Sequence, residues 1–167
     1  AGVREVVLLN HARKVRFERG DEPAVWAESG ASLGAIARQA ATAGLGGLEW
    51  AAGIPGTLGG AVVGNAGSRG GDTGGSLELA DILHQDLGEQ AWTKADLGFG
   101  YRDSRLKRES GSAVVLAASL RLAHRDEDQI RSEMDAFLAY RRLTQPPGAS
   151  MGSMFKNPQG DAAGRLI

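Results

Sequence analysis

Glycine is concentrated in residues 44–75, and this concentration limits how the chain can fold more than any other feature of the sequence. Thirteen of the 25 glycines in the 167-residue chain fall there. Glycine supplies about 15% of all residues, against roughly 7% in an average protein. Because glycine is costly to order, it is favoured where the backbone needs a positive φ or must approach another group closely. The stretch therefore predicts tight turns or a close contact with a ligand.

The composition is otherwise that of a folded protein without cysteine chemistry. Hydrophobic residues make up 42% and charged residues 23%, and the net charge is −1. This balance supplies no basic field for nucleic acid or an anionic membrane. The absence of cysteine excludes disulfides, thiolate catalysis and Cys-ligated metal sites. With no apolar run of about 18 residues and no signal-peptide pattern, we expect a cytoplasmic protein.

Hydrophobic periodicity predicts strands on both sides of the glycine-rich stretch, at residues 3–9, 14–18, 24–27, 77–83 and 113–122. A helix is expected from Leu33, with Ser32 as its N-cap and Gly44 as its stop, and a second over residues 126–143.

A Gln-Pro-Pro-Gly sequence follows the second helix and is a candidate domain boundary. We therefore expect one domain over residues 1–145 and the start of another over residues 146–167. The last segment is too short to be a domain. The chain opens almost directly into a predicted strand and stops at Ile167, directly after Arg165 and Leu166. This pattern predicts a fragment of a longer polypeptide.

From Gly53 to Gly59 a glycine stands at every third position, and Gly60 follows. A turn of this kind can point several backbone N–H groups at a phosphate, and Thr57 would add a hydroxyl donor. The stretch contains neither the Rossmann G-x-G-x-x-G nor the phosphate loop G-x-x-x-x-G-K-[ST]. From these residues alone, a phosphate-binding turn and a turn that only packs tightly are equally open.

Two further clusters place polar groups in loops. Arg102 follows Tyr101 in a glycine-flanked segment, and arginine can bind a carboxylate or phosphate through two N–H groups. Taken alone, these residues favour the plainer interpretation, in which Tyr101 packs in the core and Arg102 pairs with Asp103 or faces solvent. Ser153 lies among small and polar residues, but a serine hydroxyl is a poor acid unless its neighbours tune it.

Histidine and serine motifs point to no further chemistry. His11, His84 and His124 are isolated and lack metal-ligand spacing, so no metal site is expected. The pattern G-x-S-x-G of hydrolases occurs around Ser32 and Ser150. Ser32 is better explained as a helix cap, and Ser150 follows a Pro-Pro break instead of a strand.

Taken in order, these clusters closely resemble the motifs of the UDP-N-acetylenolpyruvoylglucosamine reductases, the MurB family. The matching motifs are Gly-Ile-Pro-Gly-Thr-Leu-Gly-Gly-Ala from residue 53, Asn-Ala-Gly from 65, Gly-Tyr-Arg-Asp-Ser from 100 and Gly-Ser-Met-Phe-Lys-Asn-Pro from 152. The first motif is shared with the wider vanillyl-alcohol-oxidase-like flavoproteins. The Tyr-Arg motif and the last motif narrow the resemblance to this one reductase.

The resemblance implies an α+β fold with a mixed-sheet FAD-binding domain of the vanillyl-alcohol-oxidase/MurB type, not a Rossmann fold, followed by the start of a substrate domain. It implies FAD as cofactor and NADPH as hydride donor. In that family, hydride passes from NADPH through FAD to C3 of the enolpyruvyl ether of UDP-N-acetylglucosamine, which yields UDP-N-acetylmuramate for peptidoglycan synthesis. The implied partner is this small-molecule UDP-sugar, and the oligomeric state is left open.

The resemblance also assigns roles to residues. Arg102 corresponds to an active-site cation near the substrate carboxylate, and Ser153 to the acid that protonates C2. Charge that develops at C2 spreads into the carboxylate, where a cation stabilises it. The implied substrate-binding residues are Tyr101, Lys156 and Asn157. The implied FAD contacts are Gly53, Ile54, Pro55, Gly56, Thr57, Gly59, Gly60, Ala61, Asn65 and Gly67.

Two parts of the family pattern are not matched by the chain: an upstream Gly-Gly-Gly-Ser-Asn-type FAD loop and a C-terminal catalytic glutamate. We therefore expect this polypeptide alone not to turn over. Two alternatives stay open. One is another flavin oxidoreductase with the same FAD domain that acts on an alcohol or hydroxy acid, and the other is a non-catalytic flavin- or nucleotide-binding module.

Overall fold

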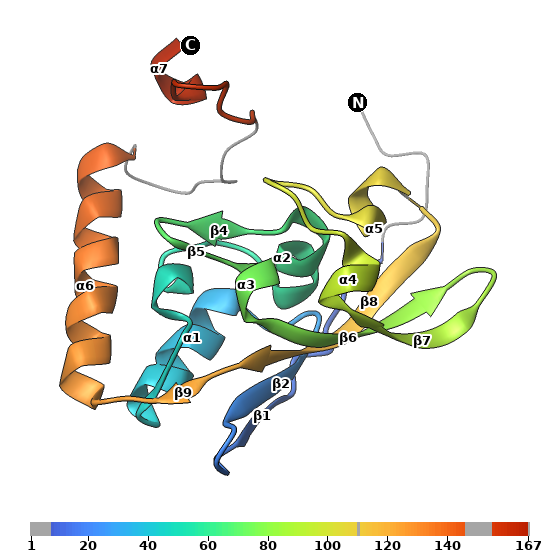
Figure 1. The fold of residues 1–167 in the computed structure, drawn as a ribbon, viewed down its shortest axis with the longest axis horizontal. Coiled ribbons are helices and arrows are strands. Elements are labelled where there is room, and N and C mark those ends of the chain that lie inside the picture. The colour runs from blue at the N-terminus through green and yellow to red at the C-terminus, as the bar shows by residue number, and fades with distance from the viewer. Residues whose placement is uncertain (1–7, 110, 146–154, 167) are drawn as a thin grey trace.

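The computed structural model describes residues 8–109, 111–145 and 155–166. Its centre is a five-stranded sheet with the order β1-β2-β8-β6-β7 (Figure 1). The strands are β1 (Val15–Glu18), β2 (Ala24–Glu28), β6 (Leu77–His84), β7 (Gly88–Thr93) and β8 (Ala113–Arg121). The α+β class is confirmed, while every described strand pair is antiparallel, so this sheet is not mixed.

Four of the predicted strands match β1, β2, β6 and β8, and β7 was not expected. Most of the strand predicted over residues 3–9 lies outside the described residues, and residues 8 and 9 belong to no strand. The predicted boundary after residue 145 also falls at residues that the structure does not describe, so the division into domains stays a prediction.

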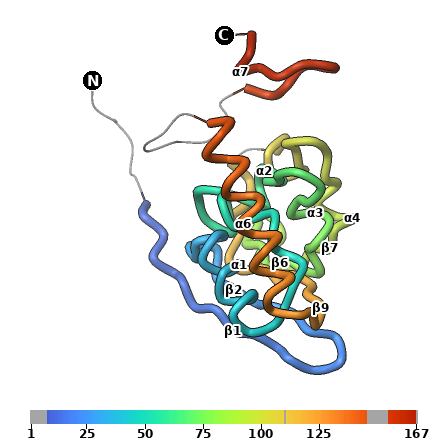
Figure 2. Tube along the Cα trace, turned by 90° about the vertical axis from the view of Figure 1, so that its left-hand side faces the viewer, coloured from blue at the N-terminus to red at the C-terminus, as the bar shows by residue number. Residues whose placement is uncertain are grey.

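Both predicted helices are present. Helix α1 (Leu33–Thr42) begins at Ser32, whose hydroxyl accepts a hydrogen bond from the Ala35 amide at 3.4 Å, so this serine is a cap. Gly44 follows the end of the helix with φ +67°. Helix α6 (Glu127–Thr144) has Asp126 as its N-cap and buries Ile130 and Met134. Figure 2 shows α6 running along α1, with which it is in contact.

The glycine-rich stretch forms several short elements. They are strand β3 (Leu45–Gly46), the 3-10 helix η1 (Glu49–Ala51), helix α2 (Leu58–Gly64), strands β4 (Gly67–Ser68) and β5 (Gly71–Asp72), and helix α3 (Thr73–Ser76). Strand β3 pairs with β9 (Ala123–His124), and β4 with β5. Helix α2 packs on β8 and β2, and Figure 1 shows α2 and α3 on the same side of the sheet.

The remaining elements are the short helices α4 (Lys94–Leu97), α5 (Arg105–Arg108) and α7 (Ala163–Leu166). The main core lies between the sheet and α1 and α2, and its fully buried side chains include Val25, Ile36, Leu58, Ile82 and Leu120. Among the described residues, no helix combines the length and apolar character needed to cross a membrane.

Candidate functional site

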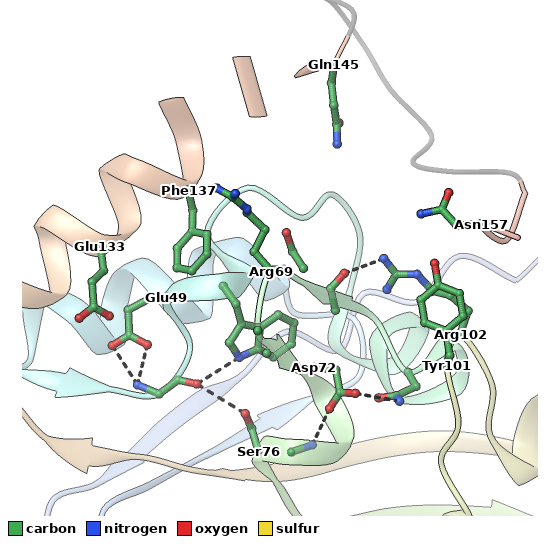
Figure 3. A pocket seen from close by; sticks show the side chains of 18 residues that line it. Glu49, Arg69, Asp72, Ser76, Tyr101, Arg102, Glu133, Phe137, Gln145 and Asn157 are labelled. Carbon is green, nitrogen blue, oxygen red and sulfur yellow. Dashed lines mark hydrogen bonds between the residues drawn. The ribbon is translucent and has the colours of Figure 1, made fainter. Parts of the chain in front are cut away.

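A cavity of about 970 Å³ lies beside the β4–β5 hairpin (Figure 3). Its walls come from parts of the chain that are far apart in sequence: η1, residues 65–76, the loop at Tyr101 and Arg102, helix α6 and Asn157. Three of these segments carry residues that the sequence marked as site residues, namely Asn65 and Gly67, Tyr101 and Arg102, and Asn157, and the fold brings them together.

The hairpin rests on the indole ring of Trp50. This ring is buried, and its Nε1 donates to the Gly47 carbonyl at 3.1 Å. A Cβ placed on Gly71 would come within 2.2 Å of Trp50 Cδ1, so the backbone of β5 lies directly against the ring. Glycine is therefore required at position 71 because any Cβ would collide with the Trp50 ring, and not because the backbone has a positive φ.

Replacing Gly71 with Ala should lower the free energy of unfolding by about 1–3 kcal/mol, because a rigid backbone and a buried indole must move apart. Urea denaturation followed by Trp fluorescence measures the change. Gly60→Ala is the matched control, since its added Cβ would meet nothing closer than Thr57 Oγ1 at 3.6 Å. Equal stability of the Gly71→Ala variant and the original chain would contradict the close contact.

The loop that carries Arg102 is closed by two backbone hydrogen bonds between Gly100 and Asp103, at 3.0 and 3.1 Å. Arg102 has φ +54°, an uncommon value for a residue with a side chain. Its Nη2 donates to the Gly67 carbonyl at 2.6 Å, and its own carbonyl accepts from Lys107 Nζ at 2.9 Å. The guanidinium is therefore held against the hairpin.

The structure of this loop differs from the interpretation that the residues alone favoured, in which Tyr101 packs in the core and Arg102 pairs with Asp103 or faces solvent. Tyr101 is 59% exposed and does not pack in the core. Asp103 pairs with Arg108 at 2.6 Å instead of with Arg102. The hydrogen bond from Arg108 holds the pKa of Asp103 below its ordinary value, and the nearby charge of Lys156 adds to this effect.

Asn65 connects the hairpin region to the Arg102 loop. It caps the end of α2 in the left-handed conformation, with φ +42°, and is only 4% exposed. Its Nδ2 donates to the Gly100 carbonyl at 2.9 Å and to Asp72 Oδ2 at 3.3 Å, while its Oδ1 accepts from the Gly74 amide at 2.9 Å. Its side-chain polar atoms therefore already have partners within the protein.

The turn that begins at Gly53 lies elsewhere. None of residues 53–61 lines the cavity. The turn runs beside residues 29–31, since the amides of Leu58 and Gly59 donate to Ala31 and Ser29 at 2.9 and 2.8 Å. Gly56 and Thr57 are exposed residues, and their amides have no acceptor among the described residues.

The implied site residues are thus divided between two places. The cavity brings together Asn65, Gly67, Tyr101, Arg102 and Asn157. Residues 53–61 form the separate turn, with Ile54 bonded back to Ala51 and Ala61 to Thr57. Lys156 lies near Asp103, and Ser153 falls outside the described residues.

An ion triad on the α6 side of the cavity was missed in the sequence. Arg125 Nη1 donates to Glu49 at 2.9 Å, and both of its terminal nitrogens donate to Glu133, at 3.0 and 2.5 Å. Glu49 is buried and also accepts the Gly47 amide at 3.0 and 2.9 Å. The hydrogen bond from Arg125 keeps the pKa of Glu133 below its ordinary value. No local signal reveals the triad, because its members are up to 84 positions apart.

Comparisons with known proteins agree with this geometry. Residues 2–85 match the model of the FAD binding domain family. The chain is 44% identical to the UDP-N-acetylenolpyruvoylglucosamine reductase of Chloroflexus aggregans over 90% of its own length and 52% of the relative. The same enzyme of Caldicellulosiruptor bescii is 42% identical over 84% of the chain and 45% of the relative. The chain thus spans about half the length of these curated relatives.

A comparison with solved structures also finds similarity to these reductases. The crystal structure of UDP-N-acetylenolpyruvylglucosamine reductase (MurB) from Thermus caldophilus superposes with a TM-score of 0.77 at 39% identity, over 85% of this chain and 52% of that one. A solvent-stable cholesterol oxidase, at a TM-score of 0.52 and 17% identity over 68% of this chain and 24% of that one, shares the fold alone. The expected fold type is confirmed, and FAD is the cofactor that its family binds. The chain therefore belongs to the FAD binding domain family, and it is similar to UDP-N-acetylenolpyruvoylglucosamine reductases over about half of their length.

Proposed function

We propose that this chain forms the FAD-binding half of a reductase that uses NADPH to reduce the enolpyruvyl ether of UDP-N-acetylglucosamine. The reaction would belong to peptidoglycan precursor synthesis in the cytoplasm. Residues 1–145 would form the FAD-binding domain, and residues 146–167 would begin the substrate domain. The observation that carries the proposal is the hydrogen bond of 2.6 Å from Arg102 to Gly67, which fixes a cation at the wall of a nucleotide-sized cavity.

The residues of the Gly53 turn fit a bound dinucleotide. A Cβ on Gly56 would meet no protein atom within 4 Å, so nothing in the described chain fills the space beside it. The amides of Gly56 and Thr57 could donate to phosphoryl oxygens, as amides in glycine-rich turns do. Bound FAD would supply hydride-transfer chemistry.

Gly60 provides a sharper indication of a ligand. It lies in the first turn of α2, where alanine would be favoured over glycine by about 1 kcal/mol. It is exposed, and its nearest potential neighbour is Thr57 Oγ1 at 3.6 Å. Because neither φ nor packing requires glycine here, we assign its lack of a side chain to the close approach of the cofactor.

The proposed catalytic roles follow from charge and position. Arg102 would stabilise the negative charge that develops on the substrate carboxylate, and its contact with Gly67 would keep it in place before substrate arrives. Ser153 would donate the proton to C2. Tyr101, Lys156 and Asn157 would bind the UDP-sugar.

Flavin binding and turnover test the proposal together. Titration of the purified chain with FAD, followed by quenching of flavin fluorescence, should show saturable binding. A complete reductase that contains this chain should consume NADPH only when the enolpyruvyl UDP-sugar is added. Reoxidation of its flavin by alcohols or hydroxy acids instead would favour the other class of flavin oxidoreductase, and binding without redox cycling would favour a non-catalytic module.

Gly60→Ala should stabilise the FAD-free chain by up to about 1 kcal/mol and weaken FAD binding about tenfold, because the added methyl group occupies the space proposed for the cofactor. Thermal denaturation and flavin titration measure the two effects. Gly64→Ala at the other end of α2 is the control, because its added Cβ would meet nothing within 4 Å and Gly64 does not line the cavity. Unchanged FAD affinity in Gly60→Ala would separate this glycine from the cofactor site.

A further inference from the structure

A second arginine, Arg69, lines the cavity on the side nearer α6, opposite Arg102 (Figure 3). It is the first of the two turn residues between β4 and β5, and both it and Gly70 have positive φ, at 29° and 87°. Hairpin turns with two positive φ values favour asparagine or glycine at the first position, because a Cβ atom crowds the following carbonyl there, glycine has none, and the short side chain of asparagine hydrogen-bonds locally. A strained arginine beside a cavity indicates that its side chain is used.

Tyr140 holds the guanidinium of Arg69 by stacking. The Arg69 Cζ atom lies 3.7 Å from the centroid of the Tyr140 ring on α6, which is a close cation–π contact. Stacking occupies the face of the guanidinium group and leaves the N–H donors at its edge available. The side chain therefore spans from the hairpin to α6 with its orientation restricted.

The carboxylates around the cavity form no ion pair with Arg69. Glu49 and Glu133 both pair with Arg125. Asp72 accepts from the Gly75 amide at 2.7 Å and from Asn65 at 3.3 Å. Among the described residues, Arg69 forms no ion pair, so it is a cation at the cavity wall without an anionic partner.

We propose that Arg69 is an anion-binding residue that holds a phosphoryl group of a nucleotide in this cavity. The inference rests on the proposed function, in which FAD and a UDP-sugar are the nucleotides, and the diphosphate of either one could supply the group. A planar guanidinium edge binds two phosphoryl oxygens at once, and prior orientation by Tyr140 reduces the entropy lost on binding.

Arg69→Asn separates binding from folding. Asparagine suits the left-handed turn position better than arginine does, so the melting temperature should stay close to that of the original chain. The dissociation constants of FAD and of UDP are measured separately by titration at two salt concentrations. For the ligand whose phosphate Arg69 holds, Arg69→Asn should raise the dissociation constant about tenfold and weaken its salt dependence.

Arg131→Gln is the matched control, because Arg131 is an exposed arginine on α6 that pairs with Glu127. It should bind both nucleotides within about twofold of the original chain. Weaker binding of FAD or of UDP in Arg69→Asn supports the inference and identifies the source of the phosphate. If the original chain binds a nucleotide and Arg69→Asn binds it equally well, the inference alone fails. If the original chain binds neither FAD nor UDP, the proposed function fails and the inference fails with it.

Discussion

Asn65→Ala should lower the free energy of unfolding by about 2–4 kcal/mol. The substitution removes three hydrogen bonds and leaves the buried Gly74 amide without a partner, which costs about 1–3 kcal/mol, while the Gly100 carbonyl keeps only its hydrogen bond from the Asp103 amide. It also places alanine at φ +42°, which adds about 1 kcal/mol. Urea denaturation monitored by circular dichroism measures the loss.

Two further substitutions at position 65 separate the contribution of the side-chain hydrogen bonds from that of the left-handed backbone conformation. Asn65→Gly removes the side chain but tolerates the left-handed conformation, so it should be about 1 kcal/mol more stable than Asn65→Ala. Asn65→Asp keeps an acceptor for Gly74 but sets a carboxylate beside Asp72, and should also destabilise the chain. A loss below about 1 kcal/mol in Asn65→Ala would show that the buried amide does not hold these segments together.

This role of Asn65 explains why only part of the site follows from the sequence. The Asn-Ala-Gly motif marks the residue, and the resemblance assigns it to the cofactor. The structure shows its side chain bonded to Gly100 and Gly74, which are 35 and 9 positions away. A motif identifies which residues matter, but their partners across the fold are set by tertiary packing.

The elements of the fold, too, follow only in part from the sequence. Helix α1 follows directly from its apolar spacing and its cap Ser32, and helix α6 follows from its apolar spacing, with Asp126 as the N-cap and not the first helical residue. Helix α2 does not, because Gly59 and Gly60 lower its helix propensity. The structure gives the reason for Gly59: its Cβ would lie 2.8 Å from Ser29 Cβ, so glycine allows α2 to pack against the preceding turn. Local propensity is overridden there by a contact between segments 30 residues apart.

The sequence also did not show that the Gly53 turn and the cavity lie in different places, which the structure does. Glycine spacing predicts exposed amides, and those of Gly56 and Thr57 lack acceptors among the described residues. The same spacing says nothing about which amides are used inside the protein, and Leu58 and Gly59 donate to residues of the neighbouring turn. Gly60→Ala tests the proposed binding of FAD at the Gly53 turn, and Arg69→Asn tests the binding of a nucleotide phosphate in the cavity.

Arg125→Met should lower the free energy of unfolding by about 2–4 kcal/mol. The substitution leaves Glu49 buried without its cation, and removal of one partner from a buried pair typically costs about 3–5 kcal/mol. The expected loss is smaller here because Arg125 is partly exposed and Glu49 keeps two hydrogen bonds from the Gly47 amide. Methionine retains much of the aliphatic stem that packs on Gly46, so the effect reports mainly on charge.

A double substitution tests the electrostatic cause. Glu49→Gln combined with Arg125→Met removes the unpaired charge. The double variant should therefore lose less free energy of unfolding than the sum of the losses in the two single variants. Arg131→Met on α6 removes an exposed arginine paired with Glu127 and should cost less than about 1 kcal/mol. Additive losses in the double variant would assign the effect to packing instead.

The pH dependence gives a second measure of the same triad. Arg125 lowers the pKa of Glu133 from its usual 4.5, so this pair contributes stability above that pH and loses it as the pH falls through the lowered value. The gap in unfolding free energy between the original chain and Arg125→Met should therefore be full near pH 7 and narrow below pH 4.5. Denaturation at pH 7 and at pH values below 4.5 measures this change. A gap that stays constant with pH would mean that Arg125 stabilises α6 through its aliphatic stem and not through its charge, because only the charge interaction titrates.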